Sequence, residues 1–298
     1  MGREEAEAAG LTAPPHASWF DAVRAAATLG GVRVGGDAPV RVLAAINVSP
    51  ESFYAGSVRG DAAALRDAAR RAVDEGADLI DVGARSTAPY RDTAVAPAEE
   101  VRRMRWAVDV VAGAVTVPVS ADTTRAAVAA AALAAGARVI NDVSGLRGDP
   151  AMADLAAQGA GVILMASPDG GPDAAPLALV QRALDDSLAR AARAGLAAGE
   201  IVLDPGIGFF TASATPAPAF ACAVLRELAA LAPLGHPLLV GVSRKRFIGT
   251  LTGRDDPADR LAGSLAAATA AVLRGAAVIR AHDVAATRDA VRVAEALR

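Results

Sequence analysis

Eight short apolar runs recur along the chain, and longer alanine-rich segments with apolar residues every three to four positions lie between them. The runs occupy residues 42–48, 79–82, 117–120, 139–143, 161–165, 201–203, 238–242 and 277–280. A short continuous apolar run is typical of a strand buried on both faces, and the three-to-four spacing is typical of an amphipathic helix. The pattern therefore predicts an α/β fold built from eight βα units.

Turn signals support this division of the chain. Asp61 is the expected N-cap of the first helix between strands, and Thr123 or Thr124 is the expected N-cap of the third. A Gly-Ala pair that begins at Gly76, Gly136 or Gly275 precedes three of the strands, at the position where glycine commonly ends a helix. The recurrence of one helix-to-strand turn indicates a repeated βα unit.

The repeated units predict a closed (β/α)8 TIM barrel, although periodicity alone does not distinguish it from an open doubly wound sheet. The count of eight favours the barrel. The glycines Gly206 and Gly208 also favour it, because they lack the third glycine of a dinucleotide-binding loop.

The first 37 residues do not follow this rhythm. Residues 1–17 are charged, contain proline and have no period, which predicts disorder, and residues 18–29 predict a short helix before a Gly-rich turn. We therefore predict a partly disordered N-terminal extension over residues 1–37 and a single barrel domain over residues 38–298. The N-terminus has acids where a signal peptide needs basic residues, and no run reaches the ~18 apolar residues of a membrane span, so we expect a cytoplasmic protein that does not enter a membrane.

Composition narrows the possible partners. A net charge of −3 gives no basic field, which argues against nucleic acid as the main partner. One cysteine excludes an internal disulfide and a Cys-rich metal site, and three histidines far apart in sequence argue against structural zinc. Since 53% of the residues are hydrophobic but only 3% are aromatic, the core must consist mainly of Val, Leu, Ile and Ala.

Polar and ionisable residues follow seven of the eight predicted strands. They are Asn47, Ser86 with Thr87, Asp122 with Thr123, Asn141 with Asp142, Asp204, Ser243 with Arg244 and Lys245, and Arg280 with His282 and Asp283. The active site of a TIM barrel lies at this end of the strands, so the pattern indicates an enzyme. Taken singly, most of these residues have an ordinary explanation as N-caps, turn residues or core groups. Those explanations do not require so many functional groups to converge on one rim.

Three of these positions suggest recognition of a flat heterocycle. Lys245 is the only lysine beside 29 arginines, which suggests a compact donor in a pocket, although a solvated loop residue is the alternative. A carboxylate such as Asp204 can accept two parallel N–H bonds from a 2-amino-4-oxo pyrimidine edge. Asn141 could recognise an edge with both donors and acceptors.

Other positions suggest stabilisation of charge during a reaction. Asp122 could lie near developing positive charge. Arg280 and His282 are two positions apart on one strand face, where they could hold an anionic leaving group. Asn47 offers a neutral oxygen that suits Mg²⁺, a cation usually shared with phosphates.

At these residues the chain resembles the dihydropteroate synthase family, from residue 42 to residue 297. The matching blocks are INVSPESF (46–53), GADLIDVGARST (76–87), VPVSADT (117–123), ARVINDVSGL (137–146), LDPGIGF (203–209), LLVGVSRKRFIG (238–249), RLAGSLAAA (260–268) and IRAHDVAAT (279–287). So many blocks in one order are highly specific, whereas a lone SRK or DPG would not be.

The resemblance implies a TIM barrel, commonly dimeric, that joins 6-hydroxymethyl-7,8-dihydropterin diphosphate to p-aminobenzoate and releases pyrophosphate. The residues that match the pterin pocket of this family are Asp122, Asn141, Asp204 and Lys245. Asn47 matches the Mg²⁺ and diphosphate residue, Thr87, Arg280 and His282 match the diphosphate contacts, and Ser243 and Arg244 match positions near the aminobenzoate. We therefore expect two small-molecule substrates, Mg²⁺ as cofactor and a homodimer.

The expected reaction is dissociative. Mg²⁺, Arg280 and His282 would stabilise the departing pyrophosphate, and Asp122 would stabilise the cationic pterin left behind. Lys245 is expected to be catalytic together with Asp122, Arg280 and His282. We infer no general base, because a neutral arylamine is already nucleophilic.

The chain departs from the family pattern in its loops. Where the family usually continues SFSDGG, residues 52–57 read SFYAGS and lack the acid. Where the family usually has GGESTRPG, residues 83–90 read GARSTAPY, so Arg85 stands in place of the acid and Ala88 in place of the arginine. Phe210 and Thr211 replace the usual Gly-Lys, and residues 165–167 (MAS) replace the histidine motif after the fifth strand.

These changes have two interpretations. We favour drift of the loops with retained activity, in which Arg85 supplies a relocated charge. Alternatively, the acceptor amine differs, or the chain is a paralogue that binds pterins without condensing them. A corrinoid-dependent methyltransferase on a similar barrel is a weaker alternative, because methyl transfer has no diphosphate for the SRK and RAHD blocks to hold.

Overall fold

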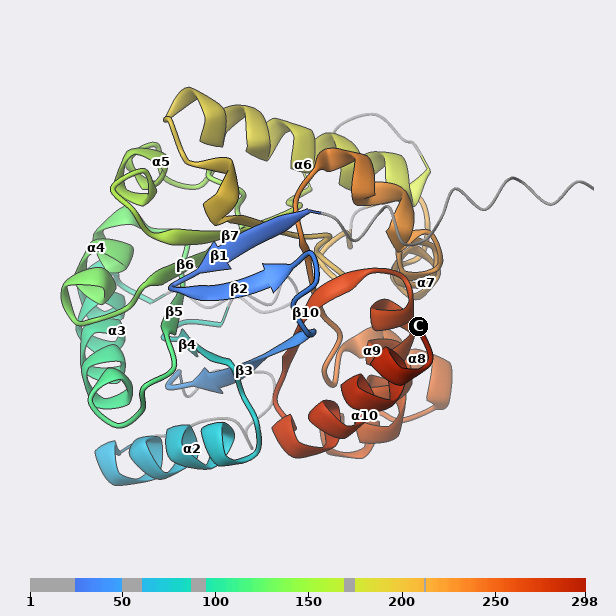
Figure 1. Cartoon of the computed structure of the whole chain (residues 1–298), viewed down its shortest axis with the longest axis horizontal. Coiled ribbons are helices and arrows are strands. Elements are labelled where there is room, and N and C mark those ends of the chain that lie inside the picture. Colours follow the sequence, from blue (N-terminus) through green and yellow to red (C-terminus); the bar gives the residue numbers. More distant parts are fainter. Residues whose placement is uncertain (1–24, 50–60, 87–94, 169–174, 212) are drawn as a thin grey trace, which may run out of the picture.

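Eight parallel strands close into a barrel in the computed structural model, which describes residues 25–49, 61–86, 95–168, 175–211 and 213–298 (Figure 1). The strands are β3 (Arg41–Asn47), β4 (Leu79–Gly83), β5 (Val119–Asp122), β6 (Val139–Asp142), β7 (Gly161–Met165), β8 (Ile201–Asp204), β9 (Leu238–Gly241) and β10 (Ala276–Ala281). They follow one another around the barrel in chain order, and β10 pairs with both β9 and β3. The predicted TIM barrel is confirmed, and the open sheet is excluded.

All eight predicted strands are present, with the largest shift at β5. This strand begins at Val119, two residues later than predicted, because Pro118 has no N–H to donate to the sheet. Asp122, Asp142 and Asp204 are the last residues of their strands. The sheet itself therefore holds these carboxylates in position.

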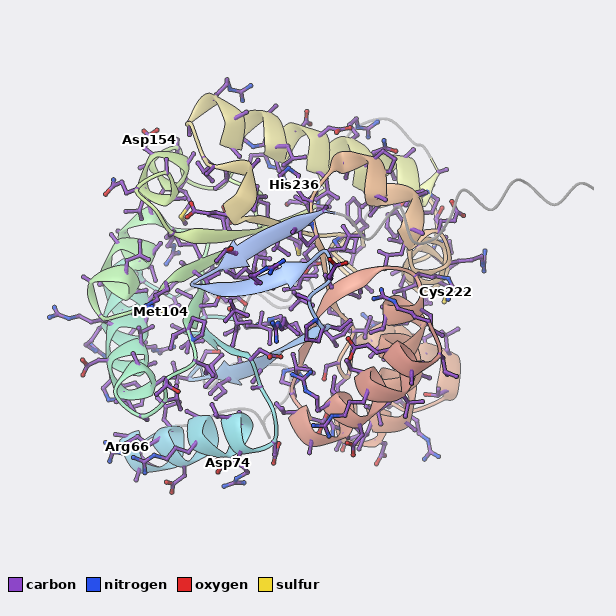
Figure 2. The ribbon with its side chains drawn as sticks, in the orientation of Figure 1. Arg66, Asp74, Met104, Asp154, Cys222 and His236 are labelled. Atoms are coloured by element: carbon purple, nitrogen blue, oxygen red, sulfur yellow. The ribbon has the colours of Figure 1, made fainter. Side chains whose placement is uncertain are left out.

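Helices cover the outside of the barrel (Figure 1). They are α2 (Ala62–Asp74), α3 (Pro97–Ala112), α4 (Ala126–Ala134), α5 (Ala151–Ala156), α6 (Pro176–Arg193), α7 (Ala217–Arg226), α8 (Arg246–Thr252), α9 (Leu261–Leu273) and α10 (Val284–Ala296), with short 3₁₀ turns η3 (Ala198–Glu200), η4 (Leu228–Leu234) and η5 (Pro257–Arg260). In α2, Leu65 and Ala69 are buried against the strands, whereas Arg66 and Asp74 lie on the exposed face (Figure 2). The apolar face predicted from the amphipathic spacing is thus the face that packs against the barrel.

The apolar residues form two cores, one outside and one inside the barrel. Along β3, Val42 and Ala44 belong to the outer core beneath the helices, while Leu43 between them belongs to the inner core. The inner core also contains Leu29 and Val34, from a segment before the barrel. Strand alternation therefore fills both sides of the sheet.

The predicted helix over residues 18–29 is wrong where the structure describes it. Strand β1 (Ala26–Leu29) pairs antiparallel with β2 (Val32–Gly35), and Figure 1 shows this blue hairpin lying across one end of the barrel. Gly30 and Gly31 form its turn, with φ of 55° and 96°, a conformation that favours a two-residue hairpin over a helix. Residues 1–17, predicted to be disordered, lie outside the described residues. The proposed division of the chain at residue 37 stays a prediction.

The helix ends agree with the sequence in part. Asp61 caps α2, since its Oδ1 accepts a hydrogen bond of 2.8 Å from the N–H of Ala64. Glycines at positions 76, 136 and 275 have positive φ and end their helices as predicted. The predicted cap of α4 is wrong, because this helix begins at Ala126 and its first N–H donates to Asp149 at 2.8 Å.

Within the described ranges no single helix has the length and apolar character needed to cross a membrane. The bent pair α7 and η4 passes such a test only when its two parts are taken together, and by length and composition alone.

Candidate active site

A cavity of about 460 Å³ lies at the carboxyl ends of the barrel strands. Seven predicted site residues line it, namely Asn47, Asp122, Asn141, Asp204, Lys245, Arg280 and His282. Met165, Phe209 and Phe247 add apolar surface to the same wall. Apolar and aromatic side chains with a few convergent polar groups are the usual lining of a small-molecule site.

Arg280 of β10 lines this cavity and joins two buried carboxylates, Asp122 in the cavity wall and Asp81 behind it. Its Nε donates to Asp81 Oδ2 at 2.7 Å, and its Nη2 donates to Asp122 Oδ2 at 3.1 Å. Asp81 Oδ2 also accepts a hydrogen bond of 3.0 Å from Asn141 Nδ2. The second oxygens of Asp81 and Asp122 are buried and accept no hydrogen bond from the residues that the structure describes. The cluster therefore keeps acceptor capacity for a ligand.

The surroundings of Asp122 favour its protonated form. Burial and the neighbouring charge of Asp81 raise the pKa of Asp122 to about 7, against the opposing effect of Arg280 and Arg85. A small change in the charge of the cavity will therefore change the ionisation of this carboxyl group near neutral pH.

Lys245 immediately precedes α8, and its side chain reaches the loop after β8. Its Nζ donates to the carbonyl oxygen of Ile207 and lies 5.1 Å from the centre of the Phe209 ring. Burial lowers the pKa of Lys245 to about 8, although the charge of Asp204 opposes this shift. Burial likewise raises the pKa of Asp204, which Lys245 opposes. The two groups thus favour each other's charged forms at the pocket floor.

His282 lines the cavity as a neutral ring. Its Nδ1 lies 3.0 Å from Ser243 Oγ, which also accepts a hydrogen bond of 3.2 Å from the backbone N–H of His282. Burial, with the nearby charges of Arg280, Arg244 and Lys245, lowers the pKa of His282 to about 3. Contact of His282 with an anion stays a prediction, and the lowered pKa favours the neutral, hydrogen-bonding form of its ring.

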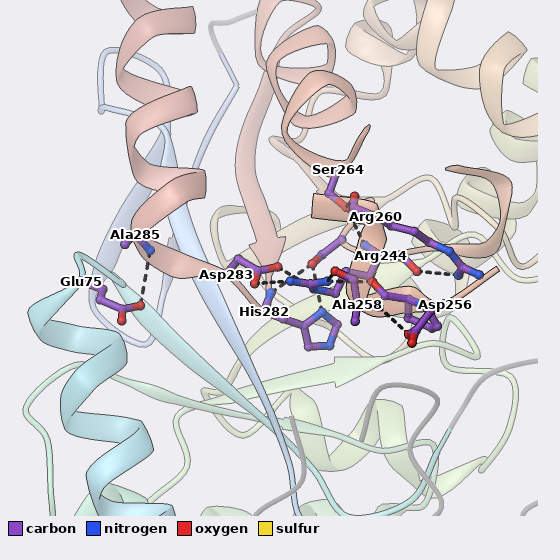
Figure 3. A network of polar contacts seen from close by, with 11 residues as sticks. Glu75, Arg244, Asp256, Ala258, Arg260, Ser264, His282, Asp283 and Ala285 are labelled. Atoms are coloured by element: carbon purple, nitrogen blue, oxygen red, sulfur yellow. Dashed lines mark hydrogen bonds and ion pairs between the residues drawn. The ribbon is translucent and has the colours of Figure 1, made fainter. Parts of the chain in front are cut away.

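Ser243 and Arg244 are not part of the cavity wall. Figure 3 shows the guanidinium of Arg244 directed at Asp283, to which it donates two hydrogen bonds of 2.8 and 2.7 Å. The remaining Nη1 donates to the carbonyl oxygens of Pro257 and Ala258. Arg244 therefore ties the β9–α8 loop to η5 and to the end of β10, while Thr87 lies outside the described residues.

Two of the acids hold turns, Asp204 as its ordinary explanation predicts and Asp142 in place of the N-cap role considered for it. Asp142 accepts hydrogen bonds of 2.8 Å from the N–H groups of Ser144 and Leu146, so it holds the loop after β6 and is not among the cavity residues. Asp204 accepts one of 2.8 Å from the N–H of Gly206 and also lines the cavity. A turn role and a site role are thus compatible in the same carboxylate.

Two important acids were missed by sequence reasoning. Asp81 lies inside the apolar run of β4. It was missed because only residues at the strand ends were considered as site candidates. Glu100 is buried in α3, where it accepts from Arg85, Arg125 and Thr123. A signal existed for Asp81, since a charged residue within a fully buried strand is retained only if it is paired.

The candidate metal residue is Asn47 at the end of β3. It lines the cavity, and its Oδ1 lies 2.7 Å from the place a Cβ would take at Gly83 on the neighbouring strand. The described residues contain no group of three His, Cys, Asp or Glu that could hold a metal. A single amide oxygen fits Mg²⁺ that takes its other ligands from a substrate diphosphate and water, and it does not fit a cation held by protein alone.

Comparisons with known proteins agree with this geometry. The model of the pterin binding enzyme family matches residues 43–282. The chain is 39% identical over 279 residues to the dihydropteroate synthase of Neisseria meningitidis serogroup B, covering 90% of this chain and 96% of that protein. It is 37% identical over 266 residues to that of Escherichia coli K12, covering 86% and 90%.

Solved structures give the same result. A structure of Xanthomonas albilineans dihydropteroate synthase with 4-aminobenzoic acid superposes with a TM-score of 0.81 at 39% identity, covering 91% of this chain and 97% of that one. A Yersinia pestis dihydropteroate synthase in complex with a sulfonamide drug superposes with a TM-score of 0.82 at 33% identity, covering 92% and 98%.

Proposed function

The chain belongs to the dihydropteroate synthase family of pterin-binding enzymes, and from this premise we infer how its cavity carries out the reaction. Its function is that of a transferase of folate biosynthesis. The reaction condenses 6-hydroxymethyl-7,8-dihydropterin diphosphate with p-aminobenzoate, and the products are 7,8-dihydropteroate and pyrophosphate. The C–O bond to the diphosphate breaks with its electron pair on the leaving oxygen, a C–N bond forms, and the arylamine loses a proton to water.

We propose that Asp204, Asn141 and Lys245 bind the pterin ring. Asp204 would accept two N–H bonds from the 2-amino pyrimidinone edge, and Asn141 would bind the adjacent edge. Support comes from their burial around one cavity and from the ammonium of Lys245 opposite the carboxylate of Asp204. A compact ammonium with three donors suits a ring carbonyl or ring nitrogen.

Asp122 is proposed to stabilise the positive charge that develops on the pterin as the diphosphate leaves. In the free protein Asp81 and burial disfavour its anionic form. A cationic intermediate would reverse that preference, since an opposite charge nearby favours ionisation. The interaction would therefore strengthen along the reaction, which is the requirement for catalysis.

Arg280 and His282 are proposed to lie at the diphosphate. Arg280 already pairs with Asp81 and Asp122, so its contribution would be to position these acids as well as to offer a remaining N–H to the leaving group. His282, being neutral, would act as a hydrogen-bond donor and not as a counter-ion. Thr87 is proposed as a further diphosphate contact on the basis of the family motif alone.

Mg²⁺ is the proposed cofactor, and Asn47 is the residue proposed to bind it. When bound, the metal would neutralise charge on the diphosphate and help it leave. Ser243 and Arg244 are proposed to act on the aminobenzoate side through the position of their loop, because the guanidinium of Arg244 is already bonded to Asp283.

Pyrophosphate release tests the proposal. Purified protein with the pterin diphosphate, p-aminobenzoate and Mg²⁺ should release pyrophosphate and form dihydropteroate, and omission of p-aminobenzoate should remove the product. A bacterial dihydropteroate synthase serves as positive control. Pterin binding in calorimetry, combined with no turnover for any arylamine, would identify the silent paralogue instead.

A homodimer is proposed through the face formed by α7, α8 and α9. A groove of about 340 Å³ crosses this face, and Leu251 at its edge is 60% exposed. Exposed apolar surface of this kind commonly marks a protein interface. Light scattering should give twice the monomer mass, and Leu251→Asp should reduce it. The cytoplasmic location stays a prediction from the sequence.

A further inference from the structure

Arg85 stands in the wall of the cavity, directly after β4. Its Nε donates to Glu100 Oε2 at 3.1 Å and its Nη2 donates to Thr124 Oγ1 at 3.1 Å. Within the described part of the chain, Nη1 makes no hydrogen bond. The side chain is 18% exposed, and its two hydrogen bonds to described residues fix one edge of the guanidinium.

The charge of Arg85 is not balanced by its partner. Glu100 is buried and also pairs with Arg125, whose Nη1 lies 2.7 Å from Oε2. Thr123 donates to the other oxygen of Glu100 at 2.9 Å. One carboxylate therefore serves two guanidinium groups.

The other buried cations of the cavity are matched by acids. Arg280 pairs with two carboxylates, and Lys245 faces Asp204. Among the described cavity residues, Arg85 is thus a partly buried cation whose acid is already shared. An anion near Arg85 would therefore meet a guanidinium whose paired carboxylate is shared with Arg125.

The position of Arg85 indicates which part of a substrate it meets. It follows Gly83 by two residues, and Gly83 is the register partner of Asn47. Arg85 therefore lies on the same side of the barrel as Asn47. Lys245 and the loop after β8 belong to strands farther around the barrel. An anionic group that shares Mg²⁺ with Asn47 would lie within reach of the open edge of the guanidinium.

We propose that Arg85 binds the diphosphate arm of the pterin substrate and remains with pyrophosphate when it leaves. The inference rests on the proposed function and on Asn47 as the metal residue. Arg85 offers a planar donor edge that suits phosphate oxygens, and Glu100 with Thr124 holds it in place before the substrate arrives.

Binding measurements with three probes test the assignment. The probes are 6-hydroxymethylpterin without phosphate, magnesium pyrophosphate, and 6-hydroxymethyl-7,8-dihydropterin diphosphate with Mg²⁺. Arg85→Gln should weaken binding of the diphosphate compound about 10- to 100-fold, because charge-assisted hydrogen bonds are lost. Binding of the unphosphorylated pterin should change less than about threefold, which shows that the site is still folded.

The matched control is Arg102→Gln, which removes the same charge from an arginine of α3 that is 78% exposed and lies outside the cavity. It should leave all three affinities within about twofold, since exposed charges are well screened. Arg85→Lys should be intermediate, because it keeps the charge but loses the planar edge.

Equal loss of affinity for all three probes in Arg85→Gln would overturn the inference, because it would mean that Arg85 only anchors α3 to the barrel. Unchanged affinity for the diphosphate compound would also overturn it. Failure of the unmodified protein to bind the diphosphate compound would instead reject the proposed function, and the inference with it. The two failures are distinguished by whether the unmodified chain or only the variant fails.

Discussion

Arg280 and Asp122 are 158 residues apart in the chain, yet Arg280 Nη2 lies 3.1 Å from Asp122 Oδ2 on the floor of the cavity. Asp81 takes the other side of the same guanidinium at 2.7 Å. Two buried acids therefore share one arginine where a cationic pterin is proposed to form. Such a site is arranged before the substrate arrives, so the burial of these charged groups lowers the stability of the free protein.

Asp122→Asn should stabilise the protein in a pH-dependent manner. The pKa of Asp122 is about 7 in the folded protein, compared with 3.8 for the unperturbed group, so ionised Asp122 disfavours folding. The destabilisation develops as the pH rises from about 4 to about 7 and is complete above that range. Thermal melting should therefore give the variant a higher Tm by at least about 2 °C at pH 8 and a smaller gain at pH 5.

The same variant should lose turnover, because an amide does not stabilise a cation as a carboxylate does. A variant less stable than the original protein at pH 8 would show that the pairing with Arg280 outweighs the burial of Asp122.

Asp81→Asn should shift the pH dependence of the reaction. The charge of Asp81 raises the pKa of Asp122, so its removal should lower that pKa. If ionised Asp122 is the active form, the acidic limb of the kcat/KM profile moves to lower pH. The variant should also be slower, about tenfold or more, since Arg280 and Asn141 both donate to Asp81 Oδ2. A slower enzyme with an unshifted limb would assign Asp81 a positioning role without the electrostatic one.

Lys245→Arg should reduce kcat/KM for the pterin diphosphate by ~10²-fold or more. The Nζ of the lysine donates to the carbonyl oxygen of Ile207 and lies 5.1 Å from the centre of the Phe209 ring. A guanidinium keeps the charge but is broader and planar, so it does not reproduce these contacts. Arg66→Lys on the exposed face of α2 is the matched exchange, and its kinetics should not change. Near-normal kinetics of Lys245→Arg would place the lysine outside the pterin site.

Gly83→Ala should raise the Mg²⁺ concentration needed for half-maximal activity, by roughly tenfold. The added Cβ would lie 2.7 Å from Asn47 Oδ1 and would displace the oxygen proposed to bind the metal. Gly199→Ala is the control, because its Cβ would meet nothing within 4 Å. A metal requirement that is equal in both variants would argue against Asn47 as the Mg²⁺ residue.

The sequence by itself determined the barrel and seven of the residues that line the cavity. Apolar runs, helical spacing and glycine turns are properties of neighbouring residues, so the strands and most helix ends could be predicted without a structure. The hairpin of residues 26–35 was missed because its first strand is rich in alanine, which favours a helix, and the turn at Gly30 and Gly31 carried the signal. Motif order also identified the family, which the comparisons confirmed.

Only the tertiary structure decided the partners of these residues. Arg244 belongs to the motif yet bonds to Asp283, 39 residues away, and Arg280 finds Asp81 across 199 residues. From the sequence, Arg85 only replaces an acid of the family pattern. The structure shows that it shares Glu100 with Arg125, and this sharing is the basis for the role proposed for its charge. The physical reason is that periodicity specifies which face a side chain occupies, whereas pairing, burial and pKa depend on which distant groups share that face after the barrel closes.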